Sequence, residues 1–431
     1  MNAPRPAACP RPDDRLVPRA PSPGHDRTAP VELVAGVWHV RSAAVARELL
    51  RSRGTLQAGF QADAVRTGVT GMRYPVLYLD GDEHRAARTS IGRYFAPTTV
   101  TRRYRDLMEQ RADELVAEIE AAGEADLADV ALRYSVDIAA QVVGLTDSDR
   151  EGMTRRLEVF FSGSLGVLSP TSGSGEKPEA AGRLARLTAG LTALRSLLPM
   201  GRFYLSDVRP AVRARRARRR DDVISHLIDQ GRSATEILSE CLTYAAAGMV
   251  TTREFLSLAA WHLLRDDALR ERYLGGGDDE RMAILLEILR LEPIIGTLYR
   301  RLAAPLEVGS GEQTVVLPAG ALVAVPVHEV DLDERVVGAG PAGEGPAQLC
   351  PGRELPPGYK PEMLGFGDGA HRCPGNALAL QESDVFLQRL LRLPLVIERD
   401  PEIGWDAVVE GFELRDVRLR VRAVAPEPAR R

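Results

Sequence analysis

Residues 233–267 form the longest run of the chain with a helical pattern. The stretch SATEILSECLTYAAAGMVTTREFLSLAAWHLLRDD has apolar residues on almost every face and contains no proline. A helix that is apolar nearly all round must be buried, so this stretch predicts a long helix through the hydrophobic core. The chain has 431 residues, of which 44% are hydrophobic, and this is enough for one large domain with a real core.

Helical patterns also dominate the rest of the chain. Apolar residues recur at helical spacing in residues 98–123, 127–145, 183–198 and 278–293. Short β-like runs occupy residues 37–40, 306–310 and 313–327, and the alternation in residues 408–424 predicts a hairpin around Phe412. The predicted fold class is therefore mainly α with small β-sheets. We expect a disordered Pro- and Arg-rich leader over residues 1–30, a single domain over 31–424 and a tail over 425–431.

Charge and cysteine content restrict the function classes. The formal net charge of -4 gives no general attraction to nucleic acid, and the arginine run in residues 209–220 is interpreted as a solvated helix end. No apolar run approaches the roughly 18 residues of a membrane span, and the N-terminus lacks the apolar segment of a signal peptide. The four cysteines contain no CxxC pair, which fits a reducing cytosol. We expect a cytoplasmic protein that binds neither nucleic acid nor a membrane.

Cys373 lies between a glycine-rich turn and an expected helix, in the stretch PEMLGFGDGAHRCPGNALALQESD (361–384). Upstream glycines permit a tight turn, and Pro374 suits the first turn of a helix. A cysteine at that junction meets free N–H groups, which stabilise a thiolate. An inert buried cysteine is the plain alternative. The chain lacks the cysteine spacing of structural zinc sites, and a single thiolate on a glycine loop suits an axial ligand to one large cofactor.

The segment FGDGAHRCPG (366–375) resembles the haem-binding signature of the cytochrome P-450 family, F-G-x-G-x-H-x-C-x-G. The matching positions are Phe366, Gly367, Gly369, His371, Cys373 and Gly375. The resemblance implies haem b (iron protoporphyrin IX) with Cys373 as the iron ligand. It also implies that Phe366 shields the sulfur and that His371 reaches a haem propionate. The implied fold is a triangular prism with the haem between the long distal helix and the helix after the cysteine loop.

Further segments occur in the order that the family has. Glu287 and Arg290 match its E-x-x-R pair, whose implied role is structural. The segment GDEHRAARTSIGRYFAP (81–97) resembles the haem-propionate helix, with His84 and Arg88 on one face. Arg300 is the third expected propionate partner, and its neighbour Arg301 is the competing assignment. The resemblance covers about residues 31–424.

The segment AAAGMVTTRE (245–254) is similar to the family's oxygen-binding helix, usually A-G-x-[DE]-T. The residues expected on the oxygen side are Ala247, Gly248, Thr251 and Thr252. Gly248 would let the helix open, and the Thr251 hydroxyl would help protonation. Val250 stands where the family has an acid that relays protons, so the usual delivery route is in doubt.

The resemblance implies a bacterial haem-thiolate monooxygenase that hydroxylates or epoxidises a small specialised metabolite. Electrons would come from a separate ferredoxin and its reductase, which would dock near Arg93, Arg102 and Arg103, and the protein would be a monomer. The expected pocket includes the 54–74 loop together with Met72, Tyr244, Met249, Val250, Ile294, Ile295, Thr297, Leu298 and Phe412. Val250 makes oxidative coupling without oxygen insertion an alternative. A peroxide-driven enzyme and a haem sensor without turnover are further alternatives.

Overall fold

The computed structural model describes residues 29–68, 73–168, 198–309, 314–399, 401–406 and 411–422. The α-helices are α1 (Ala43–Arg51), α2 (Ala62–Gly68), α3 (Gly81–Phe95), α4 (Pro97–Thr99), α5 (Arg105–Ala122), α6 (Leu127–Val143), α7 (Arg150–Leu168), α9 (Arg209–Ala217), α10 (Val223–Asp229), α11 (Ala234–Tyr244), α12 (Thr251–Arg265), α13 (Asp267–Gly275), α14 (Asp278–Leu291), α15 (Val327–Val330) and α16 (Asn376–Leu390). Short 3-10 or π segments are η1 (Val76–Tyr78), η2 (Val100–Tyr104), η3 (Tyr204–Val208), η4 (Ala245–Val250) and η6 (Gly369–His371). The fold is mainly helical, as predicted.

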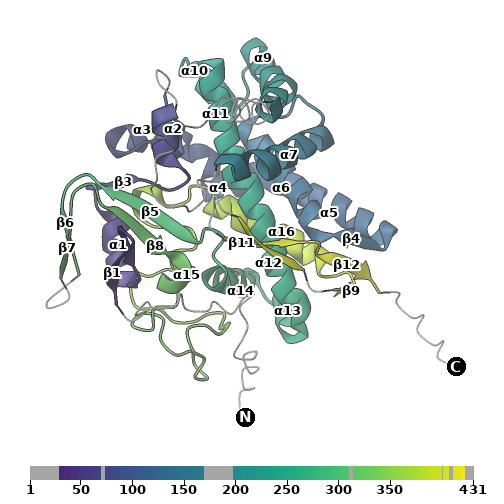
Figure 1. Cartoon of the computed structure of the whole chain (residues 1–431). Coiled ribbons are helices and arrows are strands. Elements are labelled where there is room, and N and C mark those ends of the chain that lie inside the picture. The colour runs from purple at the N-terminus through teal and green to yellow at the C-terminus, as the bar shows by residue number, and fades with distance from the viewer. Residues whose placement is uncertain are drawn as a thin grey trace, which may run out of the picture.

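The predicted long helix is confirmed and runs through the middle of the molecule as α11, η4 and α12 (Figure 1). It begins with a capping box in which the Ser233 and Glu236 side chains each accept a hydrogen bond from the other residue's backbone N–H. The central part, Ala245–Val250, has π-helical geometry. A π turn inserts an extra residue into the ladder of backbone hydrogen bonds and often marks a functional site. The helix is therefore opened where the sequence predicts the oxygen-binding segment.

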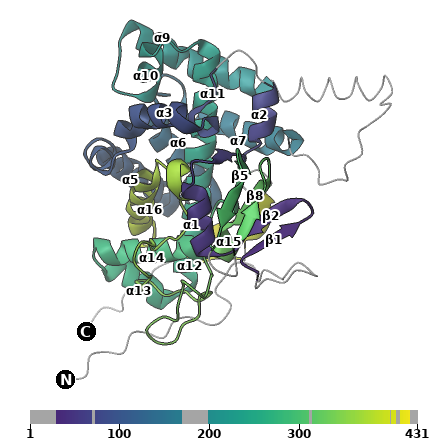
Figure 2. The same cartoon turned by 90° about the vertical axis from the view of Figure 1, so that its left-hand side faces the viewer.

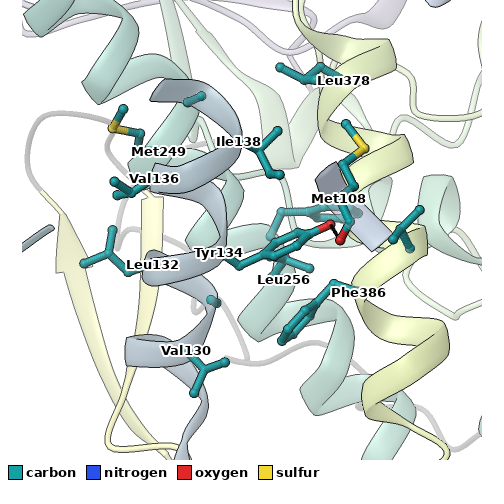
Figure 3. Packing of buried hydrophobic residues seen from close by; sticks show 14 of the residues in the cluster. Met108, Val130, Leu132, Tyr134, Val136, Ile138, Met249, Leu256, Leu378 and Phe386 are labelled. Carbon is teal, nitrogen blue, oxygen red and sulfur yellow. Dashed lines mark hydrogen bonds between the residues drawn. The ribbon is translucent and has the colours of Figure 1, made fainter. Parts of the chain in front are cut away.

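The main core forms where α5, α6, α12 and α16 pack together (Figure 3). Tyr134 of α6 is fully buried there, and its ring lies 4.9 Å from that of Phe386 on α16. The Tyr134 hydroxyl donates to the carbonyl oxygen of Met108 or of Glu382, at 3.3 and 3.2 Å. Because the hydroxyl has acceptors, the ring can be buried without an unsatisfied polar group. This core holds α16 against α12, and it thereby sets the position of the cysteine loop that precedes α16.

Among the described residues, the β structure is minor and lies in four small sheets. The strands are β1 (Val31–Val34), β2 (Val37–Val40), β3 (Thr55–Gln57), β4 (Glu124–Asp126), β5 (Thr297–Leu302), β6 (Leu306–Val308), β7 (Val315–Leu317), β8 (Leu322–Pro326), β9 (Leu395–Ile397), β10 (Glu402–Asp406), β11 (Gly411–Arg415) and β12 (Arg418–Val421). The largest sheet has the order β1-β2-β8-β5-β3, and α1 lies against it (Figure 2). A second core cluster fills the space between this sheet and α1.

The predicted hairpin around Phe412 is wrong in its pairing. Phe412 lies in β11, but β11 pairs with β10, so that Phe412 is opposite Trp405. The following strand β12 pairs instead with β4 and β9. Asp416, between the two strands, has a positive φ of 54°, and the chain there passes from one sheet to another. Alternation alone could not show this, because a period of two does not identify the partner strand.

The predictions on the arginine run and on membrane spans can be tested on the described residues. The arginine run forms ion pairs: Arg215 is fully buried and contacts Asp147 and Asp222. Asp222 caps α10, because its side chain accepts from the backbone N–H of Ser225. Within the described residues, no helix is both long and apolar enough to span a membrane. Residues 1–28, all but the last residue of the helix expected over 183–198, and the tail over 425–431 lie outside the described residues.

Candidate functional site

Cys373 ends a tight loop that leads directly into α16. Its backbone N–H donates to the carbonyl oxygen of Phe366 at 2.8 Å, which closes the loop. Gly369 has a φ of 68°, and a Cβ there would lie 2.0 Å from the carbonyl oxygen of Leu50 in α1. Only glycine fits at this position, because the loop is pressed against α1. The loop is therefore fixed on both sides, and the sulfur position is set by backbone geometry.

Two opposing effects act on the charge of the Cys373 sulfur, and their net result in the protein alone is a raised pKa of the thiol. Its side chain is partly exposed. Burial raises the pKa of the thiol, while the backbone N–H groups of Gly375 and Asn376 and the charges of Arg88 and Arg372 act to lower it. Donors of this kind stabilise a thiolate, and a bound metal ion adds further positive charge. The chemistry of this site fits an iron ligand.

Four basic side chains gather beside the cysteine loop. They are His84 and Arg88 from α3, Arg300 from β5 and His371 from the loop itself. The rings of His84 and His371 are stacked with their centroids 4.0 Å apart. Burial, together with His371 and Arg88, lowers the pKa of His84 to about 4, and burial lowers the pKa of Arg300 to about 10 despite the nearby Asp80. The structure thus brings together all the residues that were predicted to hold the propionates. Haem carries two propionate carboxylates, which match this excess of donors and positive charge.

The structure distinguishes the two neighbouring arginines of β5. Arg300 is 3% exposed and donates to the side-chain oxygen of Gln57 at 2.9 Å. Arg301 points to the other face of the strand, where it donates to Asp63 at 2.6 Å and to the carbonyl oxygen of Gly320 at 3.1 Å. Successive side chains of a strand face opposite sides. Arg300 is therefore the residue of the pair that lies on the side of Gln57 and Asp80.

On the central helix, Ala247, Gly248 and Thr251 face open space. Ala247 is exposed although it lies in the middle of a core helix, and Thr251 is half-buried. A Cβ added to Gly248 would meet only Ala139, at 3.7 Å. The Thr251 hydroxyl donates to the carbonyl oxygen of Ala247 at 2.7 Å. This face has the small residues and the single hydroxyl that the oxygen side of the predicted site requires.

Thr252 does not belong to this face, which corrects its assignment to the oxygen side. Its side chain is 3% exposed, and its hydroxyl donates to Glu382 of α16 at 3.1 Å. One residue along a helix turns the side chain by about 100°, so Thr251 and Thr252 cannot face the same space. The sequence analysis missed Glu382. Burial raises the pKa of Glu382 well above its usual range, and its second carboxyl oxygen has no hydrogen-bond partner among the described residues.

The predicted pocket residues fall into three groups. Met249 and Ile294 are wrong as pocket residues, because both are buried in the main core, and Val250 is also buried (Figure 3 shows Met249). The partly exposed ones are Tyr244, Ile295, Thr297, Leu298 and Phe412. The Tyr244 hydroxyl has no hydrogen-bond partner among the described residues. Met72 lies outside them.

Glu287 and Arg290 form the buried pair that the E-x-x-R pattern predicts. Arg290 is completely buried and donates to both carboxyl oxygens of Glu287, at 2.8 and 2.7 Å. It also donates to the carbonyl oxygens of Asp331 and Pro346. Arg353, which the sequence analysis missed, lies 3.5 Å from Glu287. The pair therefore holds the long coil before the cysteine loop against α14.

Comparisons with known proteins agree with this fold and site. The family model described as Cytochrome P450 matches residues 282–393. The erythromycin C-12 hydroxylase of Saccharopolyspora erythraea is 28% identical over 382 residues, which cover 85% of this chain and 85% of the hydroxylase. Among solved structures, CalO2 has a TM-score of 0.72 at 20% identity and covers 92% of this chain and 94% of its own. The open cytochrome P450 EryK from S. erythraea has a TM-score of 0.69 at 25% identity, with 93% and 94% covered.

The mainly helical fold, with Cys373 on the loop before α16, is the fold of the solved cytochrome P450 structures. The family-model match and the actinobacterial relatives support a bacterial cytochrome P450, a class of monooxygenase-type oxidoreductases that bind iron protoporphyrin IX. The alternative of a haem sensor without turnover is therefore set aside.

Proposed function

We propose that Cys373 is the thiolate ligand of the haem iron and that the protein uses oxygen to hydroxylate or epoxidise a small specialised metabolite. The observation that carries the ligand assignment is the Cys373 loop: a cysteine closed by its own hydrogen bond to Phe366, surrounded by donors that favour a thiolate, and placed beside four basic side chains. When bound there, the haem supplies the oxygen-activating chemistry.

Other residues of the chain would bind the propionates, assist protonation and line the substrate pocket. Arg88 and Arg300, with His84 and His371, would hold the propionates. Thr251 would hold a proton donor on the substrate side, because its hydroxyl is the polar group beside the open face at Ala247. The partly exposed side chains of Tyr244, Leu298 and Phe412 would form part of the pocket wall.

The substrate class is supported by two relatives. The erythromycin C-12 hydroxylase is similar over most of both chains, and the structure of HmtN, described as a post-tailoring hydroxylase involved in himastatin biosynthesis, shares the fold with a TM-score of 0.67. Both names refer to specialised metabolites. A metabolite of this kind is the substrate class that we propose.

The ligand assignment is tested by the carbon-monoxide difference spectrum of the reduced protein. We expect the red-shifted Soret band of thiolate-ligated haem in the wild type and its loss in Cys373→Ala. Cys241→Ala is a matched control, because Cys241 is also a free cysteine but is buried in α11, away from the cysteine loop. A wild type without the band, or a Cys373→Ala variant that keeps it, would contradict the proposal.

Oxidative coupling is the second candidate reaction, and one observation favours it. Val250 stands where the family has an acid. Its side chain is buried, so this position supplies no acid to the open side. A weaker proton supply would suit a reaction in which substrate radicals combine. Product mass separates the two candidates: a gain of one oxygen supports hydroxylation, and a loss of two hydrogens supports coupling. Turnover with peroxide alone would instead indicate a peroxide-driven enzyme.

The electron donor that we propose is a separate ferredoxin with its reductase, acting on a monomer of this protein. Arg102 is the best contact of the three predicted arginines, because it is exposed and has no ion-pair partner among the described residues. Arg103 contacts Asp221, and Arg93 lies 3.8 Å from the same carboxylate. Arg102 lies in η2, which packs against α16, the helix that follows Cys373. An acidic partner bound there would be near the proximal side of the haem.

A further inference from the structure

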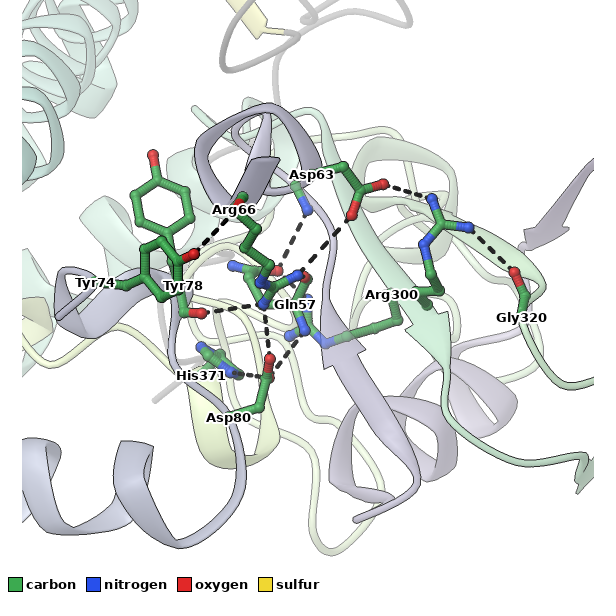
Figure 4. Close-up of polar contacts among 11 residues, drawn as sticks. Gln57, Asp63, Arg66, Tyr74, Tyr78, Asp80, Arg300, Gly320 and His371 are labelled. Atoms are coloured by element: carbon green, nitrogen blue, oxygen red, sulfur yellow. Dashed lines mark hydrogen bonds and ion pairs between the residues drawn. The ribbon is translucent and has the colours of Figure 1, made fainter. Parts of the chain in front are cut away.

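Asp80 stands at the N-cap position of α3 but does not cap the helix. An aspartate at this position usually accepts a hydrogen bond from a backbone N–H of the first turn, and the Asp80 side chain makes no such bond. One carboxyl oxygen lies 3.2 Å from Nε2 of His371 and accepts from the backbone N–H of Gln57 at 2.9 Å. The other accepts from Arg66 at 2.8 Å. The carboxylate is therefore turned away from its own helix, toward His371 and Arg66 (Figure 4).

Arg66 connects this carboxylate to α2. Its guanidinium also donates to the carbonyl oxygens of Gln57 and Tyr78, at 2.7 and 3.0 Å. The Tyr74 hydroxyl donates back to the carbonyl oxygen of Arg66 at 3.0 Å. One side chain thus joins α2, β3 and the segment before α3. These elements belong to or border the 54–74 loop, which the sequence analysis placed at the pocket.

The same network reaches Arg300. Gln57 lies opposite Arg300 in the antiparallel pair of β3 and β5, and its side-chain oxygen accepts from Arg300. Two of the four expected propionate partners, His371 and Arg300, are therefore oriented by Asp80 and Gln57. A guanidinium or imidazole held in one orientation loses less entropy when it binds a carboxylate.

The positive charge of Arg66 balances the negative charge of Asp80. This leaves the guanidinium groups of Arg88 and Arg300 as the fixed positive charges for two propionates. Without Arg66, the Asp80 carboxylate would stand beside His371 uncompensated, and it would repel the propionates in a partly buried site. The ion pair therefore removes an unfavourable charge from the haem edge.

We propose that Asp80 and Arg66 are positioning residues that hold His371, and through Gln57 also Arg300, in the orientation in which these two side chains bind the haem propionates. This inference rests on the proposed haem site.

The test uses the holoprotein with Asp80→Asn, Arg66→Met and the double variant. Arg301→Met is the matched control, because the Arg301–Asp63 pair also ties α2 to β5 but does not touch Asp80. The measurements are the rate of haem transfer to apomyoglobin, the haem reduction potential and hydrogen exchange of the α2 backbone amides.

We expect Arg66→Met to release haem about tenfold faster, because His371 and Arg300 would no longer be held in one orientation before they bind the propionates. Its reduction potential should fall, since the uncompensated carboxylate favours the ferric state. In the double variant the potential should return toward that of the wild type, while haem release stays fast. Arg301→Met should increase exchange in α2 and leave haem release and the potential unchanged.

Two outcomes would overturn the inference. If Arg66→Met and Arg301→Met change haem release equally, mobility of α2 alone explains the effect. If Arg66→Met and Asp80→Asn both match the wild type in release and in potential, the network has no positioning role. The carbon-monoxide spectrum of each protein keeps the two proposals apart: a missing thiolate band in the wild type refutes the haem-ligand proposal, whereas a normal band with unchanged rates refutes only this one.

Discussion

Replacing Arg290 with methionine should destabilise the protein more than any surface ion-pair change. Arg290 is completely buried and makes four hydrogen bonds, two to Glu287 and one each to the carbonyl oxygens of Asp331 and Pro346. Methionine fills a similar volume but leaves the Glu287 carboxylate, which is 4% exposed, with only the backbone N–H of Cys350 and the more distant Arg353. Breaking a buried pair by removing one partner costs about 3–5 kcal/mol.

The assay is urea unfolding at saturating haem, followed by far-UV circular dichroism. Arg85→Met is the control, because Arg85 and Asp82 form an i,i+3 pair at 3.1 Å with side chains 65% and 92% exposed, and such pairs contribute at most about 1 kcal/mol. Adding Glu287→Gln to Arg290→Met should recover part of the loss, since the buried charge is then removed. If Arg290→Met lowers the unfolding free energy no more than Arg85→Met does, the buried pair does not have the structural role argued above.

Three further predictions concern the substrate side, the central helix and the partner surface. Thr251→Ala should lower the amount of product formed per reducing equivalent consumed, because the hydroxyl beside Ala247 is lost. An unchanged ratio of product to reducing equivalents would refute a role of Thr251 in protonation. Burial raises the pKa of Glu240 to about 7, so the folded state binds more protons than the unfolded state between about pH 4.5 and 7. The wild type should therefore lose stability relative to Glu240→Gln as the pH rises through this range, as urea midpoints would show, and a constant difference would contradict the assignment. Arg102→Glu should slow reduction by ferredoxin and weaken its salt dependence, and equal stopped-flow rates would exclude this contact.

Several features of the site could be predicted because their signals are local in the chain. The cysteine loop is recognised from glycines and a proline within ten residues of each other, and Glu287 and Arg290 share a helix face through their spacing alone. The buried central helix follows from its apolar pattern. Even so, the reason for one glycine was different from the expected one. Gly369 is required by the carbonyl oxygen of Leu50 in α1, whereas the sequence suggested only a tight turn.

Other features could not be predicted, because their partners are far away in the chain. Asp80 and His371 are separated by 291 positions, and Thr252 and Glu382 by 130. No periodicity within a segment contains such contacts, so Asp80, Gln57, Arg353 and Glu382 were missed. Met249 was placed in the pocket for the same reason, since the sequence does not show that α6 covers that face of the helix.

The sequence by itself determined the cofactor and the family, because a haem ligand and its loop are encoded by neighbouring residues that must follow one another. Only the tertiary structure decided which of two adjacent residues faces the site: Thr251 rather than Thr252, and Arg300 rather than Arg301. In each case the two neighbours are chemically alike, and the choice between them depends on how a helix or strand is rotated against the rest of the core.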